Sequence, residues 1–362
     1  MRKHEGDNGG RVPEQAGYEE CQHGDAGYRH NGFAIAVAWP ETLCKQPGSW
    51  YDSLAGKLGI SRNNYYRAGH AALVLVESET GRCHYFDFGR YHAPYQHGRV
   101  RNGETDPGLA IRFRARISAD GMRIDNFREI MTVLQHNVEY HGDGTLYASY
   151  CKVNFELAYE KAIEMQAASP IAYGPFVYGG SNCSRFVNTC ILAGDPDLRH
   201  RARLRLLVPL TPTPMNNVNS LTNKIEIPHL REELPSCPQP VRDKRTLKST
   251  LPEPVRPSDL PDNAQWLSGE GAGRWFAMVR TGEHYLIRRF SPKGDLECEN
   301  IFSVANNRSF DIDRPYRFEH ISHCREVRLS QGGKYFDLMI YSSENHHQSD
   351  PELTDTVMAG NK

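Results

Sequence analysis

The sequence has no apolar run long enough to cross a lipid bilayer, which takes about 18 consecutive apolar residues. Its longest candidate, Phe33 to Trp39, has only the length of a strand. The N-terminal segment MRKHEGDNGGRVPEQAGYEE starts with basic residues but lacks the apolar stretch of a secretory signal. We therefore expect a cytoplasmic protein with no integral membrane segment. An export route not visible in the sequence would make cell-wall peptides candidate substrates.

An excess of charge of either sign is also missing. The chain of 362 residues contains 43 Lys and Arg against 44 Asp and Glu, so its formal net charge is -1. A protein that binds nucleic acid or an anionic membrane through its overall charge is usually strongly basic. The charge balance therefore predicts no nucleic-acid partner.

The nine cysteines are too few and too dispersed for a disulfide scaffold, and none forms a CxxC pair. We interpret them as thiols. No zinc-like spacing links the cysteines and histidines that could be grouped together, namely Cys83, His84, His92, His97 and His141. The sequence therefore predicts no metal site.

The remaining composition, 39% hydrophobic and 24% charged, suits globular cores, and the length favours about two domains. Polar composition predicts tails at residues 1–31 and 343–362, and repeated prolines predict a linker at residues 216–262. These boundaries leave a first domain at residues 32–215 and a small all-β domain at residues 263–342.

Strand-like patterns are clear in the first domain. The apolar run from His70 to Val76 and the segment from Cys83 to Gly89, joined by ETGR, predict a β-hairpin. Apolar residues alternate with arginines from Leu109 to Ile117, which predicts a further strand. A similar alternation at residues 201–206 indicates an exposed strand face, for which binding of a phosphate or lipid headgroup is an alternative role.

Two helices are expected in the same domain. Apolar residues share one helical face from Ile124 to Leu134 and another from Phe155 to Ile163, with Asp125 and Asn154 as plausible N-caps. The predicted fold class is α+β, with helices packed on an antiparallel sheet.

The second domain contains five aromatic-rich, strand-like segments separated by turn sequences: WFAMV, EHYLIRRF, LECENIF, YRFEHIS and YFDLMIY. None of them presents a chemical constellation. We interpret this domain as an accessory or packing module that can recruit a protein partner.

The most informative segment is GGSNCSRFVNTCILAG, from Gly179 to Gly194. Its apolar spacing predicts a helix that begins at Cys183, with Asn182 or Ser181 as N-cap. At a helix N-terminus the backbone N–H groups favour thiolate over thiol and can bind an oxyanion. The alternative is a small core residue, as we expect for Cys190.

A nucleophilic cysteine needs a general base, and His70 is the best placed histidine in the pattern. It opens the apolar strand HAALVLV directly after Ala68 and Gly69. A histidine at the end of a rigid strand has a fixed direction, which suits a base. The alternative is a strand-terminal histidine that faces solvent.

Taken together, GHAALVLV followed by SNCSRFVNT resembles the circularly permuted papain-like cysteine enzymes of the NlpC superfamily, which include lecithin:retinol acyltransferase. The resemblance covers about residues 32–212. It implies a permuted papain-like (NlpC-type) domain with Cys183 as nucleophile and His70 as base, since His precedes Cys in the permuted order.

The residue that orients His70 is less well defined. A two-residue TG turn would place Tyr91 opposite His70 and Asp87 opposite Val74, and a slip by one residue would bring Arg90 or His92 opposite instead. By analogy with the family, the orienting residue lies opposite the histidine. We take His92 as the third catalytic residue, with Tyr91 and Asp87 as alternatives.

These residues predict a cysteine-dependent hydrolase of an amide or peptide bond that acts through a thioester acyl-enzyme and needs no cofactor. Its partner is then a peptide, amide or acyl substrate. The alternatives are an acyltransferase or thioesterase on lipid substrates and a non-catalytic binding module on the same fold.

Overall fold

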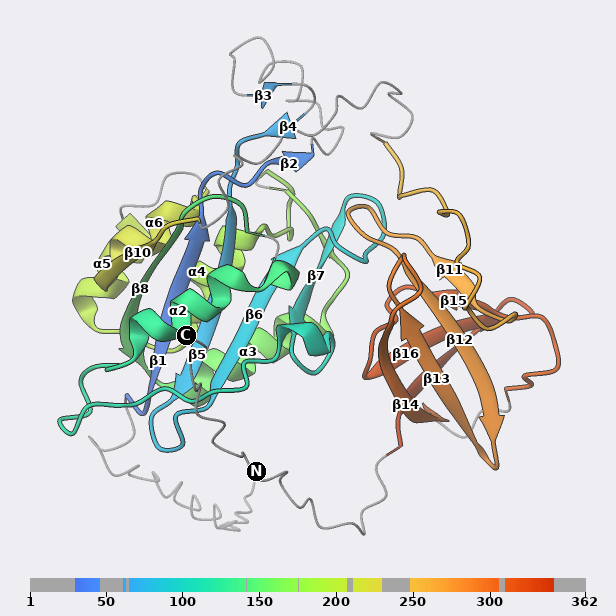
Figure 1. The fold of residues 1–362 in the computed structure, drawn as a ribbon. Helices are drawn as coiled ribbons and strands as arrows, with labels where there is room; N and C mark the ends of the chain where they lie inside the picture. Colours follow the sequence, from blue (N-terminus) through green and yellow to red (C-terminus); the bar gives the residue numbers. More distant parts are fainter. Residues whose placement is uncertain are drawn as a thin grey trace, which may run out of the picture.

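The computed structural model describes residues 30–45, 61–62, 65–140, 142–174, 176–206, 211–229, 248–305 and 310–341. They form two β-sheet bodies side by side (Figure 1). The tails predicted at residues 1–31 and 343–362 lie almost wholly outside the described residues, as do residues 230–247 of the predicted linker.

The first body is built on a seven-stranded sheet in the order β10-β8-β1-β5-β6-β7-β9. All of its ladders are antiparallel. Its strands are β1 (Gly32–Trp39), β5 (His70–Glu77), β6 (Cys83–Gly89), β7 (His97–Asn102), β8 (Leu146–Val153), β9 (Ile171–Ala172) and β10 (Thr222–Ile227). A small separate sheet consists of β2 (Cys44–Lys45), β4 (Tyr65–Tyr66) and β3 (Ser61–Arg62).

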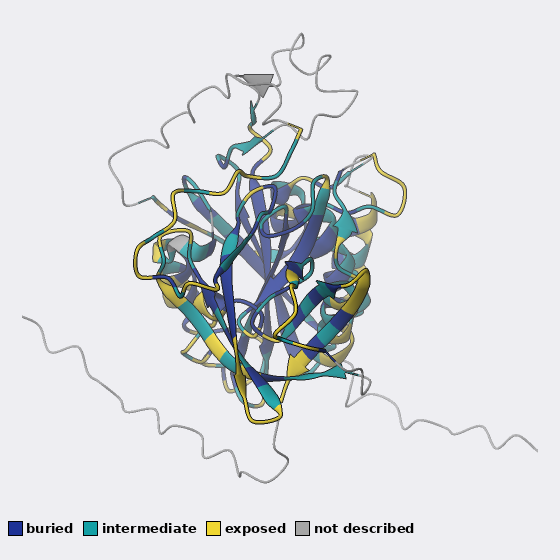
Figure 2. Cartoon of the chain, turned by 90° about the vertical axis from the view of Figure 1, so that its right-hand side faces the viewer, coloured by how far each residue is buried: buried dark blue, intermediate teal, exposed yellow. Residues whose placement is uncertain are grey.

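Helices cover both faces of the first sheet. One face packs against α2 (Phe127–His136) and the other against α3 (Phe155–Ala167), α4 (Cys183–Ala193), α5 (Leu198–Leu206) and α6 (Pro214–Ser220). Single 3-10 turns lie at Pro107–Leu109 and Val138–Tyr140. Because both faces are covered, the central strands β1 and β5 are almost wholly buried, which explains their continuous apolar runs (Figure 2).

The second body is a nearly closed sheet of seven antiparallel strands in the order β11-β12-β13-β14-β17-β16-β15. Its strands are β11 (Gln265–Leu267), β12 (Arg274–Thr281), β13 (His284–Phe290), β14 (Leu296–Val304), β15 (Arg317–Glu319), β16 (Glu326–Gln331) and β17 (Lys334–Ile340). The Gln265 side chain bridges the two edge strands by bonds to Tyr316 O (3.2 Å) and Phe318 N (3.3 Å). The five predicted strand segments all contain strands of this sheet, while β11 and β16 have no counterpart in the prediction.

Four expectations about secondary structure are wrong. Helix α2 begins at Phe127 with Asn126 as its N-cap, where the sequence pattern predicted Asp125. Leu109–Ile117 is not a strand: Ile111, Phe113 and Ile117 pack on the core as the alternation requires, but the segment pairs only through the isolated bridge Ile117↔Ile124. The arginine alternation at residues 201–206 lies in α5. The linker was expected to begin at residue 216, but residues 216–227 lie in the end of α6 and in β10. Strand β10 pairs with β8 and forms that edge of the sheet.

The interpretation of every cysteine as a thiol is also wrong. Cys298 of β14 and Cys324 form a disulfide, which joins residues 26 positions apart through the fold of the second body. Among the described residues, the free cysteines are Cys44, Cys83, Cys151, Cys183 and Cys190. A separation of 26 residues with no other pattern gives no sequence signal for this pairing.

Candidate active site

Cys183 is the first residue of α4, as the apolar spacing predicts. The N-cap is Asn182: its side-chain oxygen accepts a hydrogen bond from Arg185 N (2.8 Å), and its amide donates to Thr211 Oγ1 (3.0 Å). Cys183 is only 7% exposed and belongs to the first turn of α4, whose backbone N–H groups have no partner within the helix.

His70 is the first residue of β5 and lies opposite Trp39 of β1. The indole of Trp39 stacks on the imidazole with ring centroids 5.7 Å apart. His70 forms a hydrogen bond with Cys183, and the Ala71 backbone also bonds to the sulfur. Strand β5 therefore brings the imidazole of His70 and α4 brings the thiol of Cys183 to the same point.

The turn after β5 decides which residue of β6 meets His70. It contains four residues, Ser78–Gly81, closed by Gly81 N to Glu77 O (2.9 Å), where the predicted turn had two. Gly81 has a φ of 68°, a conformation that favours glycine. The register therefore shifts by two residues, and Asp87 pairs with Ala72, diagonally next to His70, where the prediction had paired it with Val74.

Asp87 is fully buried in β6 and is the carboxylate next to His70, with its Oδ2 atom 3.5 Å from His70 Nε2. Arg101 of β7 donates to both of its oxygens, from Nε at 2.9 Å and Nη2 at 2.6 Å. The hydroxyl of Tyr85 donates a further bond at 3.1 Å. This set of donors satisfies a buried carboxylate that would otherwise be costly.

Tyr91 is the second group at the imidazole, with its hydroxyl 3.2 Å from His70 Nε2. The Arg101 guanidinium lies over its ring, 3.5 Å from the centroid. Asp87 and Tyr91 therefore both contact Nε2 of His70.

The prediction of His92 as the orienting residue does not agree with this arrangement. His92 is buried against the second body: Nε2 lies 3.0 Å from Leu267 O, and the ring stacks on Phe276. The four-residue turn accounts for the difference, because it moves the residues beyond Gly89 out of register with β5. The positions the sequence left open, Asp87 and Tyr91, contact His70 instead.

The pKa values of the pair reflect these contacts. Burial alone would lower the pKa of His70, but its hydrogen bonds to Asp87 and Cys183 outweigh burial and raise the pKa to about 9. Burial alone would raise the pKa of the Cys183 thiol, but its bond to His70 and the positive charge there hold it below its ordinary value. Burial would also raise the pKa of Asp87, and Arg101 instead holds it far below its usual range. Both members of the pair are thus shifted toward their charged forms.

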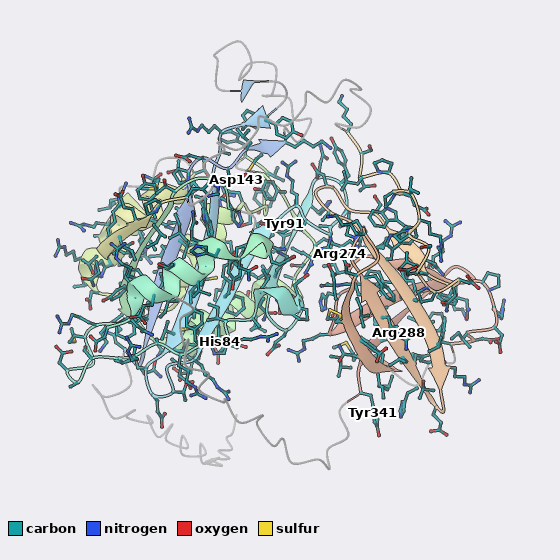
Figure 3. The ribbon with its side chains drawn as sticks, viewed as in Figure 1. His84, Tyr91, Asp143, Arg274, Arg288 and Tyr341 are labelled. Carbon is teal, nitrogen blue, oxygen red and sulfur yellow. A yellow bond between two sulfur atoms is a disulfide. The ribbon has the colours of Figure 1, made fainter. Side chains whose placement is uncertain are left out.

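Cys183 and His70 line a cavity of about 650 Å³. Its walls come from β2, from the segment after β6, from the segment before α4 and from the second body, which contributes Leu251, Glu270 and Gly271. Tyr91 and Asp143 mark this end of the first body (Figure 3). The cavity is of a size that ordinary ligand sites have.

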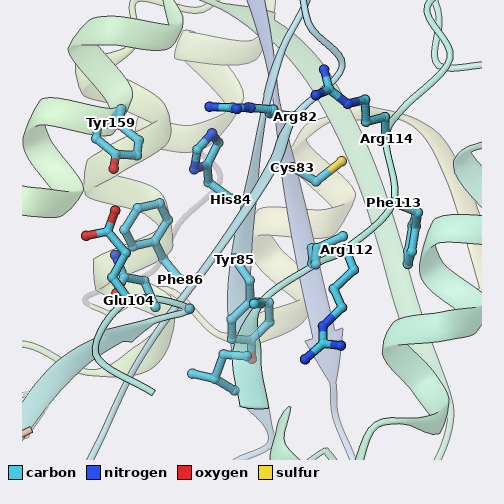
Figure 4. A pocket seen from close by; sticks show the side chains of 15 residues that line it. Arg82, Cys83, His84, Tyr85, Phe86, Glu104, Arg112, Phe113, Arg114 and Tyr159 are labelled. Atoms are coloured by element: carbon cyan, nitrogen blue, oxygen red, sulfur yellow. Dashed lines mark hydrogen bonds between the residues drawn. The ribbon is translucent and has the colours of Figure 1, made fainter. Parts of the chain in front are cut away.

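A second cavity, of about 350 Å³, lies at the other end of β6 around His84 (Figures 3 and 4). It contains neither Cys183 nor His70. Arg82, Arg112 and Arg114 border it, but the Arg112 guanidinium points away from the other two (Figure 4). Its groups do not converge on one point, so we do not interpret it as the reactive site.

In the described part of the chain, no three His, Cys, Asp or Glu side chains gather so as to hold a metal ion. Of the helices that the described residues form, none is long and apolar enough to cross a membrane.

The sequence pattern did not predict the contact between Arg101 and Asp87, and it offered Asp87 only as an alternative to His92. A signal was available, because an aspartate between the aromatic residues of CHYFDFG must have a cationic or hydrogen-bonding partner if that strand is buried. The partner itself comes from β7 and has no signature in sequence.

Comparisons with known proteins match the two bodies separately. Residues 34–199 match the family profile described as type VI secretion system effector TseH-like, and residues 264–340 match the profile of the DUF6695 C-terminal domain. Among solved structures, the chain is similar to the crystal structure of the type VI secretion system effector TseH. That similarity has 19% sequence identity, covers 56% of this chain and 95% of the other, and has a TM-score of 0.37. The comparison with curated proteins found no significant match.

Proposed function

We propose that this protein is a cysteine-dependent hydrolase of an amide or peptide bond, with the permuted papain-like arrangement of the NlpC superfamily. The observation that carries the proposal is the close grouping of Cys183, His70 and Asp87 at the wall of the larger cavity. A thiol at a helix start, beside an imidazole that a carboxylate also contacts, has the parts needed for acyl transfer.

In the proposed reaction the Cys183 thiolate attacks the carbonyl carbon, and N–H groups at the start of α4 stabilise the oxyanion. Protonated His70 gives its proton to the leaving amine as the C–N bond breaks, which leaves a thioester on Cys183. A water molecule then attacks the thioester while His70 accepts its proton. The C–S bond breaks, the acid is released, and the thiolate and protonated His70 are restored.

The test is the pH dependence of Cys183 alkylation by iodoacetamide, read residue by residue by mass spectrometry. In the wild type we expect a midpoint well below the ordinary thiol value of about 8.5. The low midpoint should be lost in His70→Ala, because the neighbouring positive charge is removed.

Cys190 is the internal control, because it lies on the same helix and burial raises its pKa. It should stay unreactive while the protein is folded. A Cys183 that reacts only when the protein unfolds would remove the basis of the proposal.

The acceptor of the acyl group separates hydrolysis from transfer to a lipid or amine, since both share the thioester. We expect released acid as the main product from peptide and ester substrates, unchanged by added amine or phospholipid acceptors. A product that carries the acceptor would make the protein an acyltransferase. Tight substrate binding with no bond cleavage would make it a binding module.

The match of residues 34–199 to the TseH-like profile supports a second proposal, that the chain is a type VI secretion system effector. This would replace the cytoplasmic site of action expected from the sequence and bring cell-wall peptides forward as substrates. The test compares growth of bacteria that make the wild type or Cys183→Ala, each with and without an added export signal. We expect arrest only by exported wild type, and equal growth in all four cultures would argue against it.

A further inference from the structure

Residues 89–96, which run from the last residue of β6 into the loop after it, bind to the second body through several backbone hydrogen bonds. Their carbonyl groups accept bonds from the loop between β11 and β12: Arg90 O from Gly271 N (2.6 Å), Tyr91 O from Ala272 N (3.1 Å) and Ala93 O from Glu270 N (3.1 Å). This segment carries Tyr91, whose hydroxyl contacts His70. The second body therefore holds a part of the candidate site.

The two backbones approach closely at glycines of the β11–β12 loop. A Cβ atom at Gly271 would lie 2.6 Å from Arg90 O, and one at Gly269 would lie 2.7 Å from Tyr91 O. Side chains at either position would therefore separate the two segments. The close approach of the two backbones therefore requires glycine at both positions.

Glu270 lies at the centre of this contact and is 2% exposed. Its carboxylate forms an ion pair with Arg90 and accepts a bond from Gln96 N at 2.7 Å. Burial would lower the pKa of Arg90, but the Glu270 charge and the bond to it raise the pKa instead. Glu270 thus binds the segment near both of its ends, at Arg90 and at Gln96.

Arg90 also contacts other walls of the cavity. Its second terminal nitrogen donates to Lys45 O of β2, and its guanidinium lies over the Tyr173 ring, 5.0 Å from the centroid. Lys45, Tyr173, Glu270 and Arg90 itself all line the cavity that contains Cys183. One side chain therefore joins the second body, β2 and the segment before α4.

From this arrangement we propose that the second body forms a wall of the substrate cleft and that Glu270 is a positioning residue, which acts by holding Arg90 and residues 89–96 in place. The proposal rests on the proposed hydrolase function and deepens it. Glu270 does not touch the reacting atoms, so its effect is on substrate binding and on the order of the segment.

The test uses Glu270→Gln and Glu270→Ala in the full chain, with Glu104→Gln as a control at an exposed ion pair. Glu104 pairs with Arg325 in another ion pair between the two bodies, but it lies outside the larger cavity. We expect KM for a cleaved peptide to rise roughly tenfold or more in Glu270→Ala and less in Glu270→Gln. The kcat should change by less than about threefold, and Glu104→Gln should behave as the wild type.

Hydrogen exchange of residues 89–96 is the second readout and does not depend on activity. The amides of this segment should exchange at least about tenfold faster in Glu270→Ala than in Glu104→Gln. Cys183 alkylation should stay within about twofold of the wild type in all three variants, because iodoacetamide is too small to need the cleft wall.

The outcomes separate the two proposals. Slow alkylation of Cys183 in the wild type would contradict the hydrolase, whatever Glu270 does. Unchanged exchange and unchanged KM in Glu270→Ala would overturn the role of Glu270 and leave the hydrolase standing. Equal effects from Glu104→Gln would also overturn the role of Glu270. Any weakening of the contact between the two bodies would then explain the changes in KM and exchange.

Discussion

At the scale of single residues, charge alternates along four buried side chains: Arg101, Asp87, His70 and Cys183. Each charged group has a partner of opposite sign, which offsets the cost of removing it from water. Because the pKa of Asp87 is lowered, its contribution to stability is present above the ordinary Asp value and is lost in acid. Because the pKa of His70 is raised to about 9, its contribution is complete below about 6.5 and is lost as pH rises through about 9.

Asp87→Asn tests this series. The amide keeps the shape of the side chain but removes its charge, so the pKa of His70 should fall and that of Cys183 should rise. We expect the alkaline limb of the kcat/KM profile, set by His70 near pH 9, to move to lower pH. The rate should fall by about 100-fold or more, and stability by about 3 kcal/mol because Arg101 loses its buried partner.

Tyr91→Phe is the control for this change, since it removes a neutral hydroxyl from the same nitrogen of His70. We expect it to leave the alkaline limb nearly in place. The measurement is the pH profile of kcat/KM for Asp87→Asn and for Tyr91→Phe on one peptide substrate. An unmoved limb in Asp87→Asn would show that the carboxylate does not set the charge of His70.

At the scale of secondary structure, the start of α4 positions Cys183, and α3 offers a similarly capped helix start away from the site. Asn182 caps α4 through Arg185 N, and Asn154 caps α3 through Leu157 N (3.0 Å). Replacement of either asparagine by alanine should lower the free energy of unfolding by about 1 kcal/mol. The two losses should be similar.

Only Asn182→Ala should also change the chemistry. A frayed first turn weakens the N–H groups near the sulfur, so the midpoint of Cys183 alkylation should move to higher pH. Chemical denaturation and alkylation of both variants give the comparison. A midpoint that moves equally in Asn154→Ala would mean that global stability, and not the cap, controls the thiol.

At the scale of the whole molecule, the contact between the two bodies contains buried charges and neutral histidines. Asp106 of the first body bonds to Arg99 and, at 3.1 Å, to Arg289 of β13. Close by, His92 and His320 lie with ring centroids 5.3 Å apart. The contact between the two bodies therefore includes Asp106, His92 and His320, whose charges depend on pH.

Acid should weaken this contact. Burial lowers the pKa of His320 to about 4 and that of His323 to about 3, and it lowers the pKa of His92 well below its ordinary value. The unfolded chain then binds more protons below about pH 6.5, so stability falls as pH falls, by up to about 1.4 kcal/mol per pH unit for each histidine. We expect a markedly lower Tm at pH 5 than at pH 7.

His92→Gln keeps a polar atom near Leu267 O and removes one titrating group. Its Tm should fall less between pH 7 and pH 5 than that of the wild type. Calorimetry at the two pH values makes the comparison. A wild-type Tm that is the same at both would exclude a protonation-linked contact.

Patterns carried by neighbouring residues were predictable from the sequence. The spacing of apolar residues, with Asn182 before Cys183 and Gly194 after the last turn, gives α4 and its first residue as observed. Likewise the apolar run of β5 gives the place of His70, and the aromatic segments give five strands of the second body. Local propensity and periodicity are enough for these features because they depend on contacts a few residues apart.

The groups that complete the candidate site depend on pairings between distant segments. A four-residue turn sets the register that places Asp87 near His70, β7 brings Arg101 to Asp87, and the second body brings Glu270 to Arg90 from 180 positions away. None of these pairings leaves a periodic trace in the sequence. The sequence therefore determined where Cys183 and His70 lie in their helix and strand, whereas the tertiary structure decided their charge partners, because register and docking arise only when the sheets and the two bodies pack together.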